Sequence, residues 1–151
     1  SLGGAITINA AGAEPGVQAL WTDSAFARLD DVIENALRNN RWLLPLRPFG
    51  ILLGRITSGD NLYSPSPIEQ VGLIGSRPFA LVHGTPDQVV PYAQMLLLVQ
   101  AASDGGSTPE TWTTDSQHVA SMVDYREEYE HRLIAFFTAS LTPPSASTLG
   151  G

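Results

Sequence analysis

Apolar segments with strand and helix spacing alternate along the chain, and this alternation constrains the fold more than any other feature. Helical spacing or helix boundary signals mark four segments, residues 2–13, 26–44, 91–103 and 124–141. Short strand-like segments lie between them, at residues 17–22, 79–82 and 110–114. Strands that alternate with helices are typically parallel and joined by right-handed crossovers. The sequence therefore predicts an α/β fold in three layers, a short parallel sheet of about three strands with helices on both faces.

Composition narrows the range of functions. The 151 residues suit one domain, and eight basic residues, all Arg, stand against fifteen acidic ones, for a net charge of −7. This balance argues against binding to nucleic acid or to an anionic membrane. The chain has no Cys, and its three His residues lack metal-ligand spacing, so we expect no disulfide, metal or cofactor. No apolar stretch reaches the roughly 20 residues of a membrane span, and we expect a cytoplasmic protein.

Three residues with catalytic chemistry are predicted to gather at one edge of the sheet. Asp87 follows the strand at 79–82, His118 follows the strand at 110–114, and Ser1 heads the first helix. Ligand chemistry in open α/β sheets sits at the carboxyl ends of the strands. The order Ser, Asp, His along the chain is that of a known hydrolase triad. We therefore expect the Asp87 carboxylate within about 3–4 Å of a ring nitrogen of His118.

Four segments carry a resemblance to one family. Residues 1–5, Ser-Leu-Gly-Gly-Ala, resemble the second half of the nucleophile elbow Gly-x-Ser-x-Gly. Residues 21–26 resemble the strand end that follows the elbow helix, and residues 77–91 resemble the strand and loop that present the catalytic acid. Residues 118–137 resemble the catalytic His and the final helix. From Ser1 to about Leu141 the chain resembles the C-terminal half of an α/β-hydrolase, of the esterase-like and peptidase-like serine hydrolases.

The resemblance implies acyl transfer from a small ester-like or acyl substrate. Ser1 would attack the carbonyl carbon, and His118 would take the Ser1 proton and pass it to the leaving group. Asp87 would hold the His118 tautomer, and the N–H of Leu2 would donate to the oxyanion.

Two departures from the family pattern leave alternatives open. The strands upstream of the nucleophile and the second oxyanion donor are missing, and Asp115-Ser116-Gln117 stands where the family usually has a Gly. We therefore expect the chain to be weak or inactive alone, with Ser1 a frayed terminal residue as the alternative to a nucleophile. Asp87 could be a turn residue and His118 a surface residue. The alternative function is a catalytically silent fragment that acts as an oligomeric binding module.

Partners and domain limits follow from the same reasoning. The strand at Val17–Thr22 is expected to expose an unpaired edge, which predicts a homodimer through that edge or an upstream half that complements it. Residues 1–141 would form the partial hydrolase domain, with residues 26–75 as a helical insertion that either covers an acyl pocket or packs on the sheet. Residues 142–151 are expected to be a disordered tail. His83 is expected to be structural, and His131 to face water.

Overall fold

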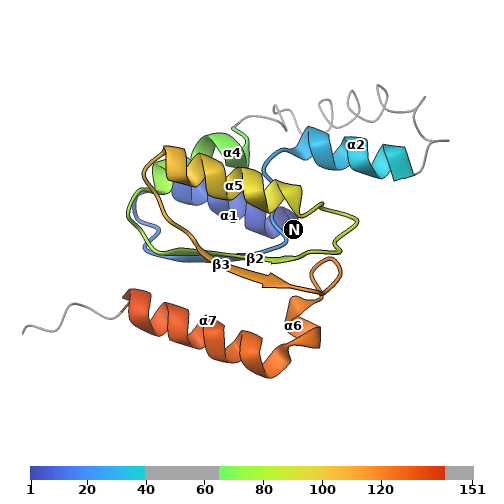
Figure 1. Cartoon of the computed structure of the whole chain (residues 1–151). Helices are drawn as coiled ribbons and strands as arrows, with labels where there is room; N and C mark the ends of the chain where they lie inside the picture. Colours follow the sequence, from blue (N-terminus) through green and yellow to red (C-terminus); the bar gives the residue numbers. More distant parts are fainter. Residues whose placement is uncertain (40–64, 142–151) are drawn as a thin grey trace, which may run out of the picture.

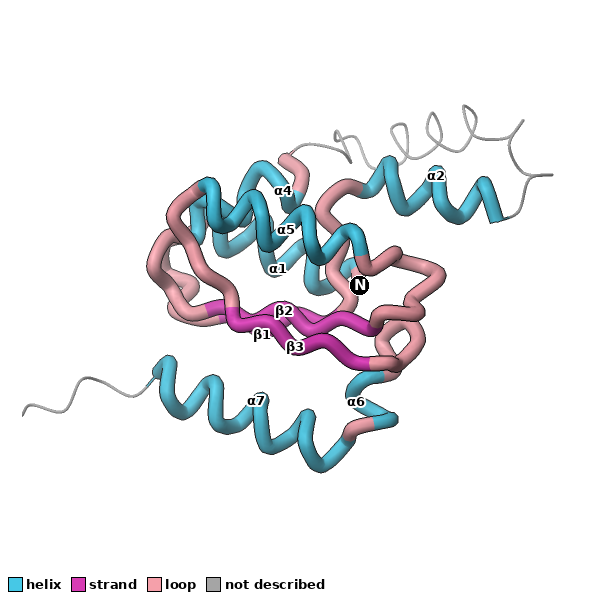
Figure 2. Tube along the Cα trace, in the orientation of Figure 1, coloured by secondary structure: helices cyan, strands magenta, loops and turns pink. Residues whose placement is uncertain are grey.

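Three parallel strands form the sheet of the computed structural model, which describes residues 1–39 and 65–141. The strands are β1 (Leu20–Asp23), β2 (Phe79–Gly84) and β3 (Glu110–Thr114), in the order β1-β2-β3. Leu20 pairs with Phe79, and Ala80 pairs with Glu110. The strands lie side by side in Figure 2. The predicted short parallel sheet is confirmed.

Helices cover both faces of this sheet, as predicted (Figure 1). One face carries α1 (Leu2–Ala13), the short helix α4 (Pro67–Gln70), the 3₁₀ turn η2 (Val71–Ile74) and α5 (Ala93–Asp104). The helix α2 (Leu29–Asn39) lies beyond this layer. The opposite face carries α7 (Arg126–Leu141), preceded by the single turn α6 (Ser121–Asp124).

The two layers of helices bury the sheet from both sides. All six residues of β2 are buried, as expected for the central strand of a parallel sheet. On the α1 face, Ile8 and Leu98 belong to the main apolar core together with Phe79. On the α7 face, the Trp21 ring packs edge-on against Tyr129 and Phe136, and its Nε1–H donates to the Tyr129 hydroxyl at 3.0 Å.

Arg77 ties the end of α1 to the start of β2. Its guanidinium donates to five backbone carbonyl oxygens, at distances of 2.7–3.2 Å, those of Ala11, Glu14, Val17, Leu73 and Ile74. The last carbonyls of a helix have no partner within the helix, and a cation there also complements the helix dipole. Arg77 thus fixes where the chain leaves α1 and where it enters the central strand.

Replacing Arg77 by Ala is expected to lower the free energy of unfolding by about 2–3 kcal/mol, because hydrogen bonds to a charged group are lost and carbonyls are left unpaired. Urea unfolding measures this change. The matched control is Arg38→Ala, since Arg38 makes an exposed i,i+4 ion pair with Glu34 and should cost about 0.5 kcal/mol or less. Equal losses in the two variants would contradict this role of Arg77.

The bounds of α1 and β3 were predicted correctly, whereas the starts of β1 and α2 were not. The strand predicted at 17–22 begins at Leu20, because the Val17 N–H donates to Glu14 O within a turn. The helix predicted from residue 26 begins at Leu29, because the N–H groups of Ala27 and Arg28 donate to the Gln94 side chain.

The helix predicted at 124–141 begins at Arg126, because Tyr125, whose φ of −120° is not helical, ends the preceding turn α6. The short helix α4 lies within the predicted helical insertion at 26–75, where no separate helix was predicted for residues 67–70.

Several predictions fall partly or wholly outside the described residues. The tail at 142–151 lies outside them, as do residues 40–64 of the predicted insertion. In the ranges 1–39 and 65–141, no strand pairs with the outer edge of β1, and the dimer through that edge stays a prediction. No helix in these ranges is both long enough and apolar enough to cross a membrane.

Candidate active site

The Asp87 carboxylate is held rigidly in the turn that follows β2. Its Oδ1 accepts the backbone N–H groups of Val89 and Val90, both at 2.9 Å. Its side chain is fully buried. The two backbone bonds leave Oδ2 for another partner. Asp87 can therefore stabilise the turn through Oδ1 and bind another side chain through Oδ2.

His118 supplies that other partner from the loop after β3. Its Nδ1 lies 2.7 Å from Asp87 Oδ2, which confirms the predicted distance between the two groups. A carboxylate oxygen accepts, so Nδ1 carries a proton, and in the neutral form of the ring Nε2 has the lone pair. No hydrogen bond to Nε2 is present within the described ranges, and the His118 side chain is 21% exposed. The imidazole is thus oriented by a buried acid, and its side chain is partly exposed.

The loop that carries His118 rests directly on the end of β2. A Cβ atom on Gly84 would stand 1.9 Å from the Ser116 carbonyl oxygen, so only glycine permits this approach. The hydroxyls of Thr114 and Ser121 are hydrogen-bonded at 2.9 Å and close the base of the loop. Asp115-Ser116-Gln117 stands where the resemblance leads us to expect a Gly. In the structure, Ser116 of this segment is the residue that lies against Gly84.

Ser1 lies at the amino end of α1, beside the carboxyl end of β1. Its amine donates to Asp23 O at 2.6 Å, and its side chain makes no capping bond to the helix. Burial lowers the pKa of this amine, and the charges of Asp23 and Asp87 oppose the shift. Leu2 is the first residue of the helix, where an N–H has no acceptor within the helix.

The structure brings two of the three predicted catalytic side chains into contact. Asp87 and His118 are hydrogen-bonded, whereas no hydrogen bond joins the Ser1 hydroxyl to His118 in the described part of the chain. Ser1 nevertheless lies at the same edge of the sheet, because Asp23, which binds its amine, is the last residue of β1.

Ser24 belongs to this site and was missed by the sequence analysis. Its hydroxyl accepts the backbone N–H of Val119, the residue after His118, at 3.2 Å. In the sequence, Asp23-Ser24 after an apolar strand indicates a turn and nothing more. Ser24 has a left-handed φ of 51°, which the presence of a serine in the sequence does not predict.

His83 has the structural role that the sequence predicted. It is 1% exposed, and its Nε2 lies 2.9 Å from Val90 O and 3.5 Å from Asp87 Oδ2. Both neighbours accept, so Nε2 carries the proton. Burial lowers the pKa of His83 from its ordinary value of 6.5, while the Val90 carbonyl and Asp87 oppose the shift. His83 therefore braces the acid loop as a neutral donor.

Folding stability is expected to fall as the pH drops below about 6.5. The unfolded chain accepts a proton on His83 there, whereas the folded chain resists it, so protonation favours unfolding. One group accounts for at most about 1.4 kcal/mol per pH unit. Urea unfolding at several pH values between 7 and 5 gives the free energy of unfolding as a function of pH. This free energy should fall less steeply with decreasing pH in His83→Gln than in the unmodified chain. The exposed residue His131 provides the control, and an equal change of slope in His131→Gln would contradict the assignment.

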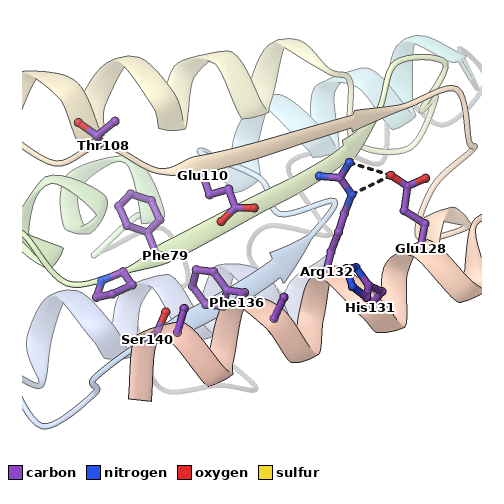
Figure 3. Close-up of a pocket in the computed structure, with 11 residues that line it drawn as sticks. Phe79, Thr108, Glu110, Glu128, His131, Arg132, Phe136 and Ser140 are labelled. Carbon is purple, nitrogen blue, oxygen red and sulfur yellow. Dashed lines mark hydrogen bonds and ion pairs between the residues drawn. The ribbon is translucent and has the colours of Figure 1, made fainter. Parts of the chain in front are cut away.

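A hollow of about 610 Å³ lies at the other end of the sheet, against α7. Its lining includes Phe79 and Glu110, the first residues of β2 and β3, whereas Asp87 and His118 follow the last residues of these strands. Figure 3 shows Arg132 paired with Glu128 at its rim. None of the predicted catalytic residues lines it, so we separate it from the candidate active site.

Comparison with solved structures places this geometry in a known fold. The esterase Pf2001 of Pyrococcus furiosus has a TM-score of 0.69 and 19% sequence identity, over 91% of this chain and 50% of that one. The acylaminoacyl peptidase of Pyrococcus horikoshii has a TM-score of 0.67 and 15% identity, over 97% of this chain and 24% of that one.

No protein-family model and no curated protein matches the sequence. The chain spans about half the length of the esterase. The nucleophile, acid and base positions of the resemblance map onto the amino end of α1 and the loops after β2 and β3, in that order along the chain. The chain has the α/β-hydrolase fold, and it spans the C-terminal part of that fold.

Proposed function

We propose that the chain is the acid–base half of a serine hydrolase that cleaves a carboxylester or a related acyl bond. The observation that carries the proposal is the 2.7 Å contact between Asp87 Oδ2 and Nδ1 of the partly exposed His118 side chain. This is the arrangement that a general base needs, because the buried acid selects the tautomer and stabilises the imidazolium. The names of the structural neighbours, an esterase and a peptidase, support the same class of reaction.

The proposed reaction is acyl transfer to water. His118 Nε2 takes the proton from Ser1 Oγ as Oγ forms a bond to the carbonyl carbon, and then gives it to the leaving group. The N–H of Leu2 donates to the oxyanion. Water then forms a bond to the carbonyl carbon while His118 Nε2 takes its proton, and the acyl–Oγ bond breaks as His118 gives that proton to Ser1 Oγ. A single oxyanion donor contributes about 3–4 kcal/mol of barrier stabilisation, and the second donor belongs to the upstream half of the family's fold.

An apolar pocket of about 310 Å³ could bind an apolar group of the substrate. Residues of α1 line one side, among them Leu2, the residue after Ser1, and Phe26, Leu29 and Asp30 line another. Phe26 and Ala5, which line this pocket, also pack against Val90 in the acid loop. Binding pockets of this kind are mostly apolar with a few polar groups at the reacting end.

A silent binding module is the second candidate. The observation that favours it is that the Ser1 hydroxyl is not hydrogen-bonded to His118 among the residues described. Under this candidate the outer edge of β1 would pair with another chain, and no serine would react. Chemical reactivity of Ser1 distinguishes the two candidates.

A fluorophosphonate that reacts with activated serines tests the proposal. We expect a slow, single adduct on Ser1, identified by peptide mass, that is absent in Ser1→Ala and forms roughly 10²-fold or more slowly in His118→Ala. Steady-state hydrolysis of a p-nitrophenyl ester should be weak, and Ser1→Ala should change it little.

The exposed residue His131 provides the control, and His131→Ala should react like the unmodified chain. Absence of an adduct, or an adduct that forms at the same rate in His118→Ala, would contradict the proposed function and favour the silent module.

A further inference from the structure

Two residues with left-handed backbone lie on either side of one hydrogen bond at the candidate active site. Ser24 has φ 51° and Val119 has φ 57°, and no other described residue except glycine has a positive φ. This region costs free energy for any residue with a side chain, and most of all for a β-branched one such as Val119. Such strain persists only where surrounding contacts enforce it, and here the contact is between the two residues themselves.

The Ser24 hydroxyl is directed by bonds on both sides. It accepts the Val119 N–H at 3.2 Å and donates its own hydrogen to Asp23 Oδ1 at 2.9 Å. Ser24 is completely buried, and its backbone N–H donates to Val82 O at 2.9 Å. The hydroxyl is therefore attached to the ends of β1 and β2, which are the rigid part of the site.

When Asp23 is ionised, its bond to the Ser24 hydroxyl is stronger than a bond between neutral groups. Hydrogen bonds to an ionised acceptor are roughly twice as strong as neutral ones. Burial raises the pKa of Asp23, and the bond from Ser24 opposes that shift, as expected for a donor that binds the carboxylate form.

His118 is the residue directly before Val119. Two hydrogen bonds therefore restrain it, one on its ring and one on the backbone of the next residue. Asp87 holds the ring through Nδ1, and Ser24 holds the backbone of the next residue. A ring fixed only at Nδ1 can still pivot about that bond and move Nε2, whereas a second anchor on the backbone removes this freedom.

We infer that Ser24 is a positioning residue that fixes His118 Nε2 through the hydrogen bond from Val119. The inference rests on the proposed function, because it takes His118 as the base. The hydrogen bonds of Ser24 within the described ranges go to Asp23, Val82 and Val119, and none goes to the His118 ring or to Ser1. Its effect is on the alignment of the base, and a misplacement of about 1 Å in such a group can cost on the order of 10²-fold in rate.

The test uses Ser24→Gly and Ser24→Ala in the full chain. Both variants remove the hydroxyl, but glycine also relieves the left-handed backbone whereas alanine keeps its strain. A result shared by the two variants therefore belongs to the hydroxyl. The control is Ser107→Ala, because the Ser107 hydroxyl is also buried but makes no hydrogen bond within the described ranges.

Three readouts are compared at a temperature where every variant is folded. Amide hydrogen exchange at Val119 should be at least roughly 10-fold faster in both Ser24 variants. The proton NMR signal of His118 Nδ1–H should broaden or vanish through faster exchange with water. The rate of fluorophosphonate reaction at Ser1 should fall roughly 10- to 100-fold. Ser107→Ala should leave all three unchanged.

The outcomes separate the inference from the function on which it rests. Unchanged Val119 exchange and an unchanged Nδ1–H signal in both Ser24 variants would overturn the inference, whatever Ser1 does. An unchanged reaction rate in both variants would overturn it too, if the same reaction still depends on His118. If instead the reaction does not depend on His118 in the unmodified chain, the proposed function fails, and the two NMR readouts alone decide whether Ser24 holds the loop.

Discussion

Replacing Asp87 by Asn is expected to slow the reaction of Ser1 by about 10²–10⁴-fold while the chain stays folded. The Asn oxygen can still accept the N–H groups of Val89 and Val90, so the turn after β2 is kept. The amide NH₂ then takes the place of Oδ2 and faces His118 Nδ1. Since two donors cannot bond to each other, His118 adopts the tautomer with the proton on Nε2 and loses its function as a base.

The adduct on Ser1, followed over time by mass spectrometry, measures this loss, and thermal unfolding checks that the variant is folded. Asp104→Asn is the matched control, because Asp104 is exposed at the end of α5 and bonds only to Gln100 among the interactions described. An Asp87→Asn variant that reacts as fast as Asp104→Asn would show that the contact between Asp87 and His118 does not activate Ser1.

Replacing Gly84 by Ala is expected to cost about 3 kcal/mol or more of unfolding free energy. The added Cβ would lie 1.9 Å from the Ser116 carbonyl oxygen, which is backbone and cannot rotate away. The loop that carries His118 must therefore move off the end of β2. Chemical denaturation measures the loss of stability, and the His118 Nδ1–H signal should be displaced or lost in the same variant.

Gly3→Ala is the control for this substitution. Gly3 lies in α1, and a Cβ there would meet no atom within 4 Å. Alanine is the better helix former, so this variant should be more stable by roughly 0.5–1 kcal/mol. Loss of stability on Gly84→Ala no larger than about 0.5 kcal/mol would contradict the close packing of the loop on β2.

Much of the fold could be predicted from the sequence because its strongest signals are local. The carboxyl end of α1 is marked by Gly12 and Pro15, and β3 lies between a Gly/Ser/Pro loop and Asp115. The start of α2, which was predicted wrongly, is set by a distant residue, because the Gln94 side chain accepts two N–H groups from the residues before the helix. A contact between residues so far apart along the chain cannot be predicted from the pattern of a short sequence segment.

The short helix α4 was missed although a signal for it exists. Ser66 and Glu69 form a capping box, in which the Glu69 side chain accepts the Ser66 N–H and Pro67 occupies the first turn. This Ser-x-x-Glu spacing with Pro after Ser typically begins a helix. The surrounding turn residues made the segment resemble a loop.

The candidate site was predictable only in part. Asp87 and His118 follow the ends of neighbouring parallel strands, so topology alone brings them to one edge. The role of Ser24 depends on its left-handed backbone and on the approach of Val119 from 95 residues further along the chain. Tertiary structure creates both features, and a serine after a strand is otherwise an ordinary turn residue.

A crystal structure of the chain after reaction with the fluorophosphonate tests the central claim most directly. We predict phosphorus bonded to Ser1 Oγ, His118 Nε2 within about 3 Å of Oγ, and the Asp87–His118 contact retained near its present 2.7 Å. The phosphoryl oxygen should accept from the Leu2 N–H. An adduct on another residue, or a Ser1 adduct with His118 Nε2 more than about 8 Å from Oγ, well beyond hydrogen-bond reach, would contradict the assignment of these residues as a catalytic triad.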